Sequence, residues 1–117
     1  MTNKEKCDFI KHFYDQKDVV GILGSFLIDD AYKDVEFAKY MKNSYPELFF
    51  GIHPIILEEL EKEKEAAKSC AALLANDKIS KQTKAEIAQK SNTLVEKIQA
   101  IIGAAKALCI TFSKANE

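Results

Sequence analysis

The sequence IAQKSNTLVEKIQAIIGAAKALCITF, residues 87–112, carries the strongest structural signal in the chain. Apolar or small residues recur along it at alternating spacings of four and three, the period of one face of an α-helix. This stripe consists of Ile87, Ser91, Leu94, Ile98, Ile101, Ala105, Leu108 and Phe112. A second row repeats every seven residues, at Ala88, Val95, Ile102 and Cys109. Because the combined face is wider than the seam of a two-stranded coiled coil, we expect more than one helix to cover it.

The preceding segment, from Pro54 to about Ala75, has the same helical period. Its apolar face consists of Ile56, Leu60, Ala67, Cys70 and Leu74. Along its flank, Glu precedes Lys by three or four positions, an order that stabilises an isolated helix by roughly 0.2–0.5 kcal/mol per pair. A polar turn follows at residues 76–78. Either Ser80 or Thr83 is suited to cap the last helix, Thr83 as part of a capping box with Glu86.

The first part of the chain predicts shorter helices. Residues 3–14 have one apolar helical stripe, and Asp18 is suited to cap the segment that follows. That segment, Val19–Ile28, is apolar on most sides, and its pattern does not by itself separate a buried helix from a strand. We favour a helix because the chain offers no second strand to satisfy the backbone groups of the first. Gly21 and Gly24 would let another helix approach closely.

A further helix is expected after residue 30. Asp29 and Asp30 have side chains suited to an N-cap and to the first turn, where the helix dipole favours negative charge. The apolar stripe of this helix consists of Ala31, Val35, Ala38 and Met41. The polar pair at residues 43–44 is expected to end it.

The region around the two prolines predicts two separate helices. Ser44 and Glu47 form a capping-box pattern, which indicates a short helix over Pro46–Phe50. Gly51 is expected to break this helix. Pro54 is then expected to begin the long helix, because the first helical position needs no backbone N–H.

These elements predict an all-α fold. A chain of 117 residues is long enough for one domain with a core of its own. We expect a single helical-bundle domain over residues 1–117. In it, a long C-terminal antiparallel helix hairpin (54–117) is covered by two or three shorter, aromatic-rich N-terminal helices (1–53).

Catalytic and metal-binding patterns are absent from the sequence. Neither histidine, His12 or His53, follows a glutamate by three residues, as a di-iron bundle requires. Cys7, Cys70 and Cys109 have no zinc-ligand spacing, and no glycine-rich phosphate loop occurs. We therefore expect no catalytic residue, no metal, no cofactor and no enzymatic activity.

The longest apolar runs, Val19–Ile28 and Ala100–Phe112, are too short to cross a membrane. The charged N-terminus is not followed by the apolar region of a secretory signal. These features predict a cytoplasmic protein without stable membrane insertion. A weaker interpretation has the second run released from the bundle onto a membrane surface.

Ten of the eleven aromatic residues fall between Phe9 and Phe50, more than a small core needs. Tyrosine and phenylalanine can anchor interfaces. The predicted partner-binding residues are Tyr32, Tyr40, Tyr45, Phe49, Phe50 and His53. The nearby acids that could steer a basic partner are Asp29, Asp30, Asp34 and Glu36. We expect a binding protein that acts on another protein as an inhibitor, an immunity-type protein or a scaffold. The alternative is that Phe49, Phe50 and Ile52 plug the end of the bundle.

The second hypothesis is a small subunit of a nucleoprotein complex. Residues 78–114 hold seven lysines and two acids, and Lys90 and Lys97 lie on one edge of the last helix, where they could follow a phosphate backbone. The alternative is a solvated lysine flank. All 17 basic residues are lysine, and the lack of arginine makes recognition of nucleic-acid bases less favourable. The heptad stripe also permits a homo-oligomer.

Overall fold

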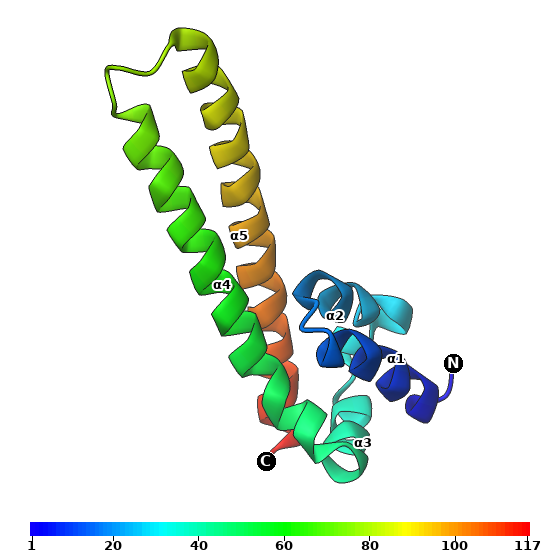
Figure 1. Ribbon diagram of the computed structural model, residues 1–117. Helices are drawn as coiled ribbons and strands as arrows, with labels where there is room; N and C mark the ends of the chain where they lie inside the picture. Colours follow the sequence, from blue (N-terminus) through cyan, green and yellow to red (C-terminus); the bar gives the residue numbers. More distant parts are fainter.

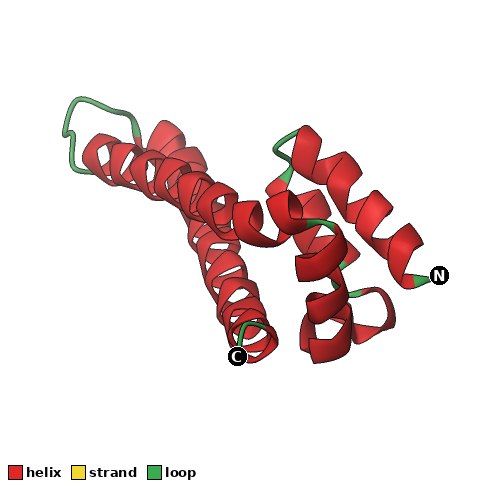
Figure 2. Ribbon diagram, turned by 90° about the horizontal axis from the view of Figure 1, so that it is seen from below, coloured by secondary structure: helices red, strands yellow, loops and turns green.

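A computed structural model describes all 117 residues, and it confirms the prediction of an all-helical chain without strands (Figures 1 and 2). The elements are α1 (Asn3–Asp15), α2 (Val19–Ser25), a 3₁₀ segment η1 (Ile28–Lys33), α3 (Val35–Ser44), α4 (Pro46–Leu74) and α5 (Lys81–Ala115). None of these helices combines the length and the hydropathy needed to cross a bilayer.

The long last helix packs on the preceding helix, as the sequence predicts (Figure 1). The chain turns back after Leu74, and Ser80 rather than Thr83 is the N-cap of α5, its hydroxyl accepting a hydrogen bond from the backbone of Thr83. Farther along the contact, Lys97 Nζ lies 2.7 Å from Glu63 Oε1 and 3.6 Å from Glu59 Oε1. This ion pair joins the two helices across their contact.

The short helices gather at one end of the α4–α5 pair and on one side of it (Figures 1 and 2). The molecule measures 56 × 25 × 21 Å because the other end of the pair projects as an arm, which we define as residues 61–100. The continuous core lies at the short-helix end, which we call the base; it includes Phe26, Phe37, Met41, Ile52, Leu108 and Phe112. Within the arm only Cys70 is fully buried. The wide apolar face of α5 is therefore covered by several helices at the base and by α4 alone in the arm.

The predicted break before Pro54 is wrong, and so is the boundary between residues 53 and 54. Helix α4 runs without interruption from Pro46 through Gly51 and Pro54. A proline inside a helix removes one backbone hydrogen bond. The side chains of Ile52 and Ile56, on either side of it, are 0% and 1% exposed, and their burial holds the helix together.

The predicted caps of α3 and α4 are also wrong. Asp29 and Asp30 have φ of 52° and 53°, in the left-handed region that aspartate tolerates, and they form a sharp reversal inside η1. Asp34 caps α3 instead, accepting a hydrogen bond of 3.0 Å from the backbone N–H of Phe37. Ser44 is the last residue of α3, and α4 starts after Tyr45 without a side-chain cap.

The helical prediction for Val19–Ile28 is right, although α2 ends at Ser25. Asp18 caps it through a 3.0 Å hydrogen bond from Gly21. The two glycines of α2 differ in their surroundings. A Cβ added at Gly21 would lie 2.6 Å from Phe13 Cγ and 2.8 Å from the capping carboxylate of Asp18, whereas one added at Gly24 would meet nothing within 4 Å. Only Gly21 is required for close packing.

We therefore expect Gly21→Ala to destabilise the protein by about 1–3 kcal/mol, because the ring of Phe13 and the cap must move. The matched variant Gly24→Ala should stabilise it by about 0.5–1 kcal/mol through helix propensity. Urea unfolding followed by circular dichroism measures both changes. Equal effects of the two substitutions would contradict the close contact between α1 and α2.

Candidate protein-binding surface

The structure does not bring the six predicted partner-binding residues together. Tyr40 and Tyr45 lie near α1, with ring centroids 6.3 Å apart. Phe49, Phe50 and His53 lie on the first turns of α4 beside the end of α5. Tyr32 lies on another side of the base, between η1 and α5. The six residues therefore belong to three separate places.

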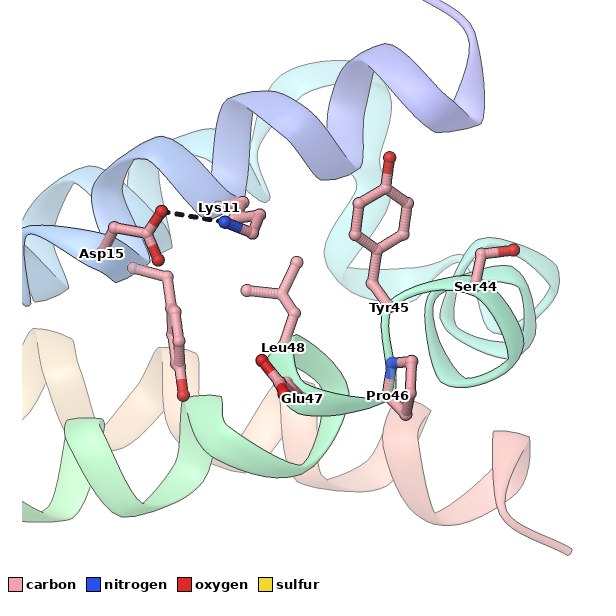
Figure 3. Close-up of a pocket in the computed structure, with 8 residues that line it drawn as sticks. Lys11, Asp15, Ser44, Tyr45, Pro46, Glu47 and Leu48 are labelled. Atoms are coloured by element: carbon pink, nitrogen blue, oxygen red, sulfur yellow. Dashed lines mark hydrogen bonds and ion pairs between the residues drawn. The ribbon is translucent and has the colours of Figure 1, made fainter.

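Tyr45 connects the junction between α3 and α4 to α1. Its hydroxyl donates a 2.6 Å hydrogen bond to Asp8 of α1. This bond raises the pKa of Tyr45 to about 12 and, together with the bond from Lys4, lowers the pKa of Asp8. A hollow of about 340 Å³ lies beside Tyr45, and Figure 3 shows the Lys11–Asp15 ion pair of 3.0 Å on its α1 wall. Of the polar groups drawn there, Lys11 and Asp15 are the two that pair with each other.

Phe49 is part of the core and offers nothing to a partner. Its side chain is 4% exposed, and its ring stacks on Phe112 with centroids 4.6 Å apart and planes at 19°. For Phe49, the geometry therefore supports the alternative in which this side chain fills the end of the bundle, and not the prediction that it binds a partner. Phe50, in contrast, is 58% exposed beside a hollow of about 270 Å³ that Cys109 and Asn116 also line.

His53 is half-buried at the same hollow. Its ring centroid lies 5.5 Å from that of Phe112, and its Nε2 is buried without a hydrogen-bond partner. Burial lowers the pKa of His53, and the backbone of Ala105 opposes this effect. The neutral imidazole is therefore the form that the fold favours.

The surface around Tyr32 is the most apolar one. A hollow of about 170 Å³ lies between α2–η1 and α5 and is lined by Leu23, Phe26, Leu27, Tyr32, Gly103, Ala104, Ala107 and Leu108. A second hollow of about 230 Å³ shares Tyr32 and Ala107 with it and extends to Lys33, Val35, Ile110, Thr111 and Lys114. We call these two joined hollows the Tyr32 groove. Leu27 and Ile110 at its edges are 67% and 60% exposed.

Two local features build this groove. The hydroxyl of Thr111 donates a 2.6 Å hydrogen bond to the backbone carbonyl of Tyr32 and so holds η1 on α5. The residues of α5 that form the floor, Gly103, Ala104 and Ala107, have little or no side chain. A Cβ added at Gly103 would meet nothing within 4 Å, so the floor is open rather than closely packed.

The charges at the rim are basic. Lys33 and Lys114 line the groove. Neither makes an ion pair, although Lys33 Nζ lies 5.3 Å from the centre of the Tyr32 ring.

The acids expected to steer a basic partner are mostly engaged. Asp34 caps α3, Glu36 pairs with Lys39 at 3.4 Å, and Asp29 pairs with Lys6 at 3.6 Å. The expectation of an acidic steering surface therefore rests on Asp30 alone.

The two lysines of the nucleic-acid hypothesis have different surroundings. Lys97 is held by Glu59 and Glu63; the bond to Glu63 raises the pKa of Lys97 and lowers that of Glu63. Lys90 is exposed on the arm. The charge of Lys97 is thus balanced inside the α4–α5 contact. Lys90 and Lys97 therefore do not form a row of unpaired positive charges.

Sequence reasoning missed Leu27, Ile110 and the floor of the groove. One signal was present: Ala100, Gly103, Ala107 and Ile110 recur at spacings of three, four and three along a face of α5 other than the seam. No set of three or more histidine, cysteine or acidic side chains gathers where it could hold a metal ion.

The lowered pKa of His53 predicts that the stability of the fold depends on pH. Its folded-state pKa lies below its usual 6.5, so its contribution to stability is present above pH 6.5 and is lost as the pH falls through the folded value. We expect His53→Gln to remove the part of the decrease in melting temperature that begins near pH 6.5 in the wild type. Thermal unfolding followed over the pH range measures this. An unchanged profile in the variant would assign the decrease to other groups.

Comparison with protein-family models, with curated proteins and with solved structures finds no match to this chain.

Proposed function

We propose that this protein is a non-enzymatic binding protein that acts on another protein, as an inhibitor or a scaffold, through the Tyr32 groove. The partner segment is a helix with an apolar face and an acidic flank. The observation that carries the proposal is the groove between α2–η1 and α5, which is apolar around Leu27 and Ala107 and is bordered by lysines without ion pairs.

The shape of the groove supports a helical segment. The floor of small residues lets a second backbone approach α5 closely, and Leu27 and Ile110 would pack against apolar side chains on either side of it. Amphipathic helices bind to apolar grooves in this way, through residues spaced at three, four and seven. Tyr32 supplies an aromatic anchor at the centre, of the kind that dominates binding energies.

The charges support an acidic flank. Lys33 and Lys114 line the groove, and charges at the edge of an interface act mainly on the association rate and on partner choice. Acids on the partner would neutralise them, whereas a basic helix would be repelled. The expected cytoplasmic location belongs to this proposal.

The nucleoprotein alternative has less support. Lys97 is compensated by two glutamates, and no other observation favours a nucleic-acid backbone over a protein. Binding of another protein is therefore the function that the charges support better.

We expect Leu27→Glu and Ile110→Glu each to weaken partner binding at least about tenfold, since each places a carboxylate in the apolar groove beside an acidic partner. Two synthetic helices with the same leucine face, one flanked by glutamates and one by lysines, serve as probes in fluorescence anisotropy. Only the glutamate-flanked helix should bind, and its association rate should fall with added salt.

The matched control is Leu73→Glu, which alters a leucine that is 46% exposed on the arm, outside the groove. It should leave the affinity unchanged. Equal binding of both helices, or equal loss in all three variants, would contradict the groove as the binding site. Circular dichroism of each variant separates loss of binding from loss of fold.

A further inference from the structure

The arm has an uncharged stripe on the side away from the short helices. On α5 it is formed by Ala85, Ala88, Asn92, Val95, Gln99 and Ile102, at alternating spacings of three and four. Ala104 and Thr111, which contact the base, lie on the opposite side of the helix, since two residues along an α-helix correspond to about 200°. The stripe therefore faces away from the Tyr32 groove.

Most of this stripe is exposed although it contains no charge, while Ala88 and Ile102 are half-buried and Ile102 packs against the core. Val95 is 43% exposed, and Ala85, Asn92 and Gln99 are exposed as well. The side-chain amides of Asn92 and Gln99 make no hydrogen bond within the chain. Residues at alternating spacings of three and four form the contact line of another helix that runs alongside. The surrounding faces of the arm, in contrast, are rich in lysine and glutamate.

We propose that this face binds a second copy of the same chain, so that two arms pack face to face and antiparallel around a two-fold axis. The axis passes midway between Asn92 and Val95 of α5. The inference is independent of the proposed function, because it uses the other side of α5.

The order of side-chain sizes supports this register. With the axis at that point, Val95 of one copy lies opposite Asn92 of the other. By the same symmetry, Gln99 lies opposite Ala88, and Ile102 lies opposite Ala85. Each larger residue thus meets a smaller one, which allows the two α5 helices to pack closely. Polar residues at such positions fix the register of paired helices.

The charges on α4 agree with the same axis. Lys97 contacts Glu59 and Glu63, so it is level with residue 61 of α4. Because the two helices run in opposite directions, a point between Asn92 and Val95 is level with residues 64–65. This point is midway between Glu61 and Lys68, both of which are exposed. The symmetry therefore places Glu61 of each copy beside Lys68 of the other, in two equivalent ion pairs.

The size of the face is sufficient for a dimer. The stripe from Ala85 to Ile102 is about 25 Å long, and α4 beside it doubles the width. Two helices over this length, with their side chains, present on the order of 500–700 Å² per copy, close to the roughly 800 Å² of a standard interface. A dimer of moderate affinity is the expected result.

Sedimentation velocity over a wide concentration range tests the dimer. The wild type should show a concentration-dependent rise from 13.2 kDa to twice this mass. Val95→Glu should abolish the rise, because it brings carboxylates into the uncharged centre of the contact. The control Val20→Glu, which alters a residue of α2 that is 61% exposed and lies outside both the arm and the groove, should dimerise like the wild type. A chain that stays monomeric at every concentration would overturn the proposal, and so would a dimer that Val95→Glu leaves intact.

A charge exchange tests the register. Glu61→Lys and Lys68→Glu alone should each weaken dimerisation by about tenfold, since each creates two like-charge contacts per dimer. The double variant Glu61→Lys/Lys68→Glu should restore it to near the wild-type value, because the pairs form again with signs reversed. Failure of the double variant to recover would reject the antiparallel register, even if the face is used.

Thiol cross-linking provides a second geometric test. In the antiparallel register the two copies of Cys109, which is exposed, lie about 45 Å apart, at 1.5 Å per residue from the axis. A short bifunctional maleimide should therefore give no dimer through Cys109. Efficient cross-linking that Cys109→Ser removes would show a parallel arrangement and overturn the proposal.

Discussion

The ring of Phe112 is the contact on which the arrangement of the helices depends. It stacks on Phe49 of α4, meets Phe26 after α2 with ring centroids 6.0 Å apart, and lies beside His53. Two segments that are distant in sequence, the end of α2 and the start of α4, thus place aromatic side chains against the last turns of α5. The burial of large aromatic rings is among the strongest contributions to a small core. The short helices are held at this end because the apolar volume is here.

Because the aromatic residues are concentrated at the base, no further helix packs on α4 and α5 in the arm. Beyond residue 60 of α4, the apolar side chains are mostly alanines, and the α4–α5 contact is a narrow seam supplemented by the Lys97 ion pairs. A seam of this kind covers only one stripe of each helix. Two further stripes of α5 stay on the surface, one beside η1 near the base and one on the far side of the arm. These are the two surfaces for which we propose partners.

The sequence was sufficient to predict the all-helical class, the long last helix and its packing on the preceding one, because these follow from local periodicity. It was not sufficient where long-range packing overrides a local signal. Pro54 stays inside α4 because Ile52 and Ile56 are buried against other helices. Asp29 and Asp30 resemble a helix cap, but the chain must reverse there. The sequence predicted that the six aromatic and histidine residues would form one surface, but they lie in three separate places. Their positions depend on how four short segments pack, which local periodicity does not show.

The two proposed surfaces act together through their geometry. They lie on opposite sides of α5, so the antiparallel contact between two arms leaves both Tyr32 grooves uncovered. Because the axis crosses the arm rather than the base, the two grooves stand at opposite ends of the dimer. A partner with two acidic helices, or a dimeric partner, would then bind both ends, and its apparent affinity would exceed that of one groove. A scaffold benefits from this spacing, and an inhibitor gains a slower release, so dimerisation of the arm would strengthen either form of the proposed function.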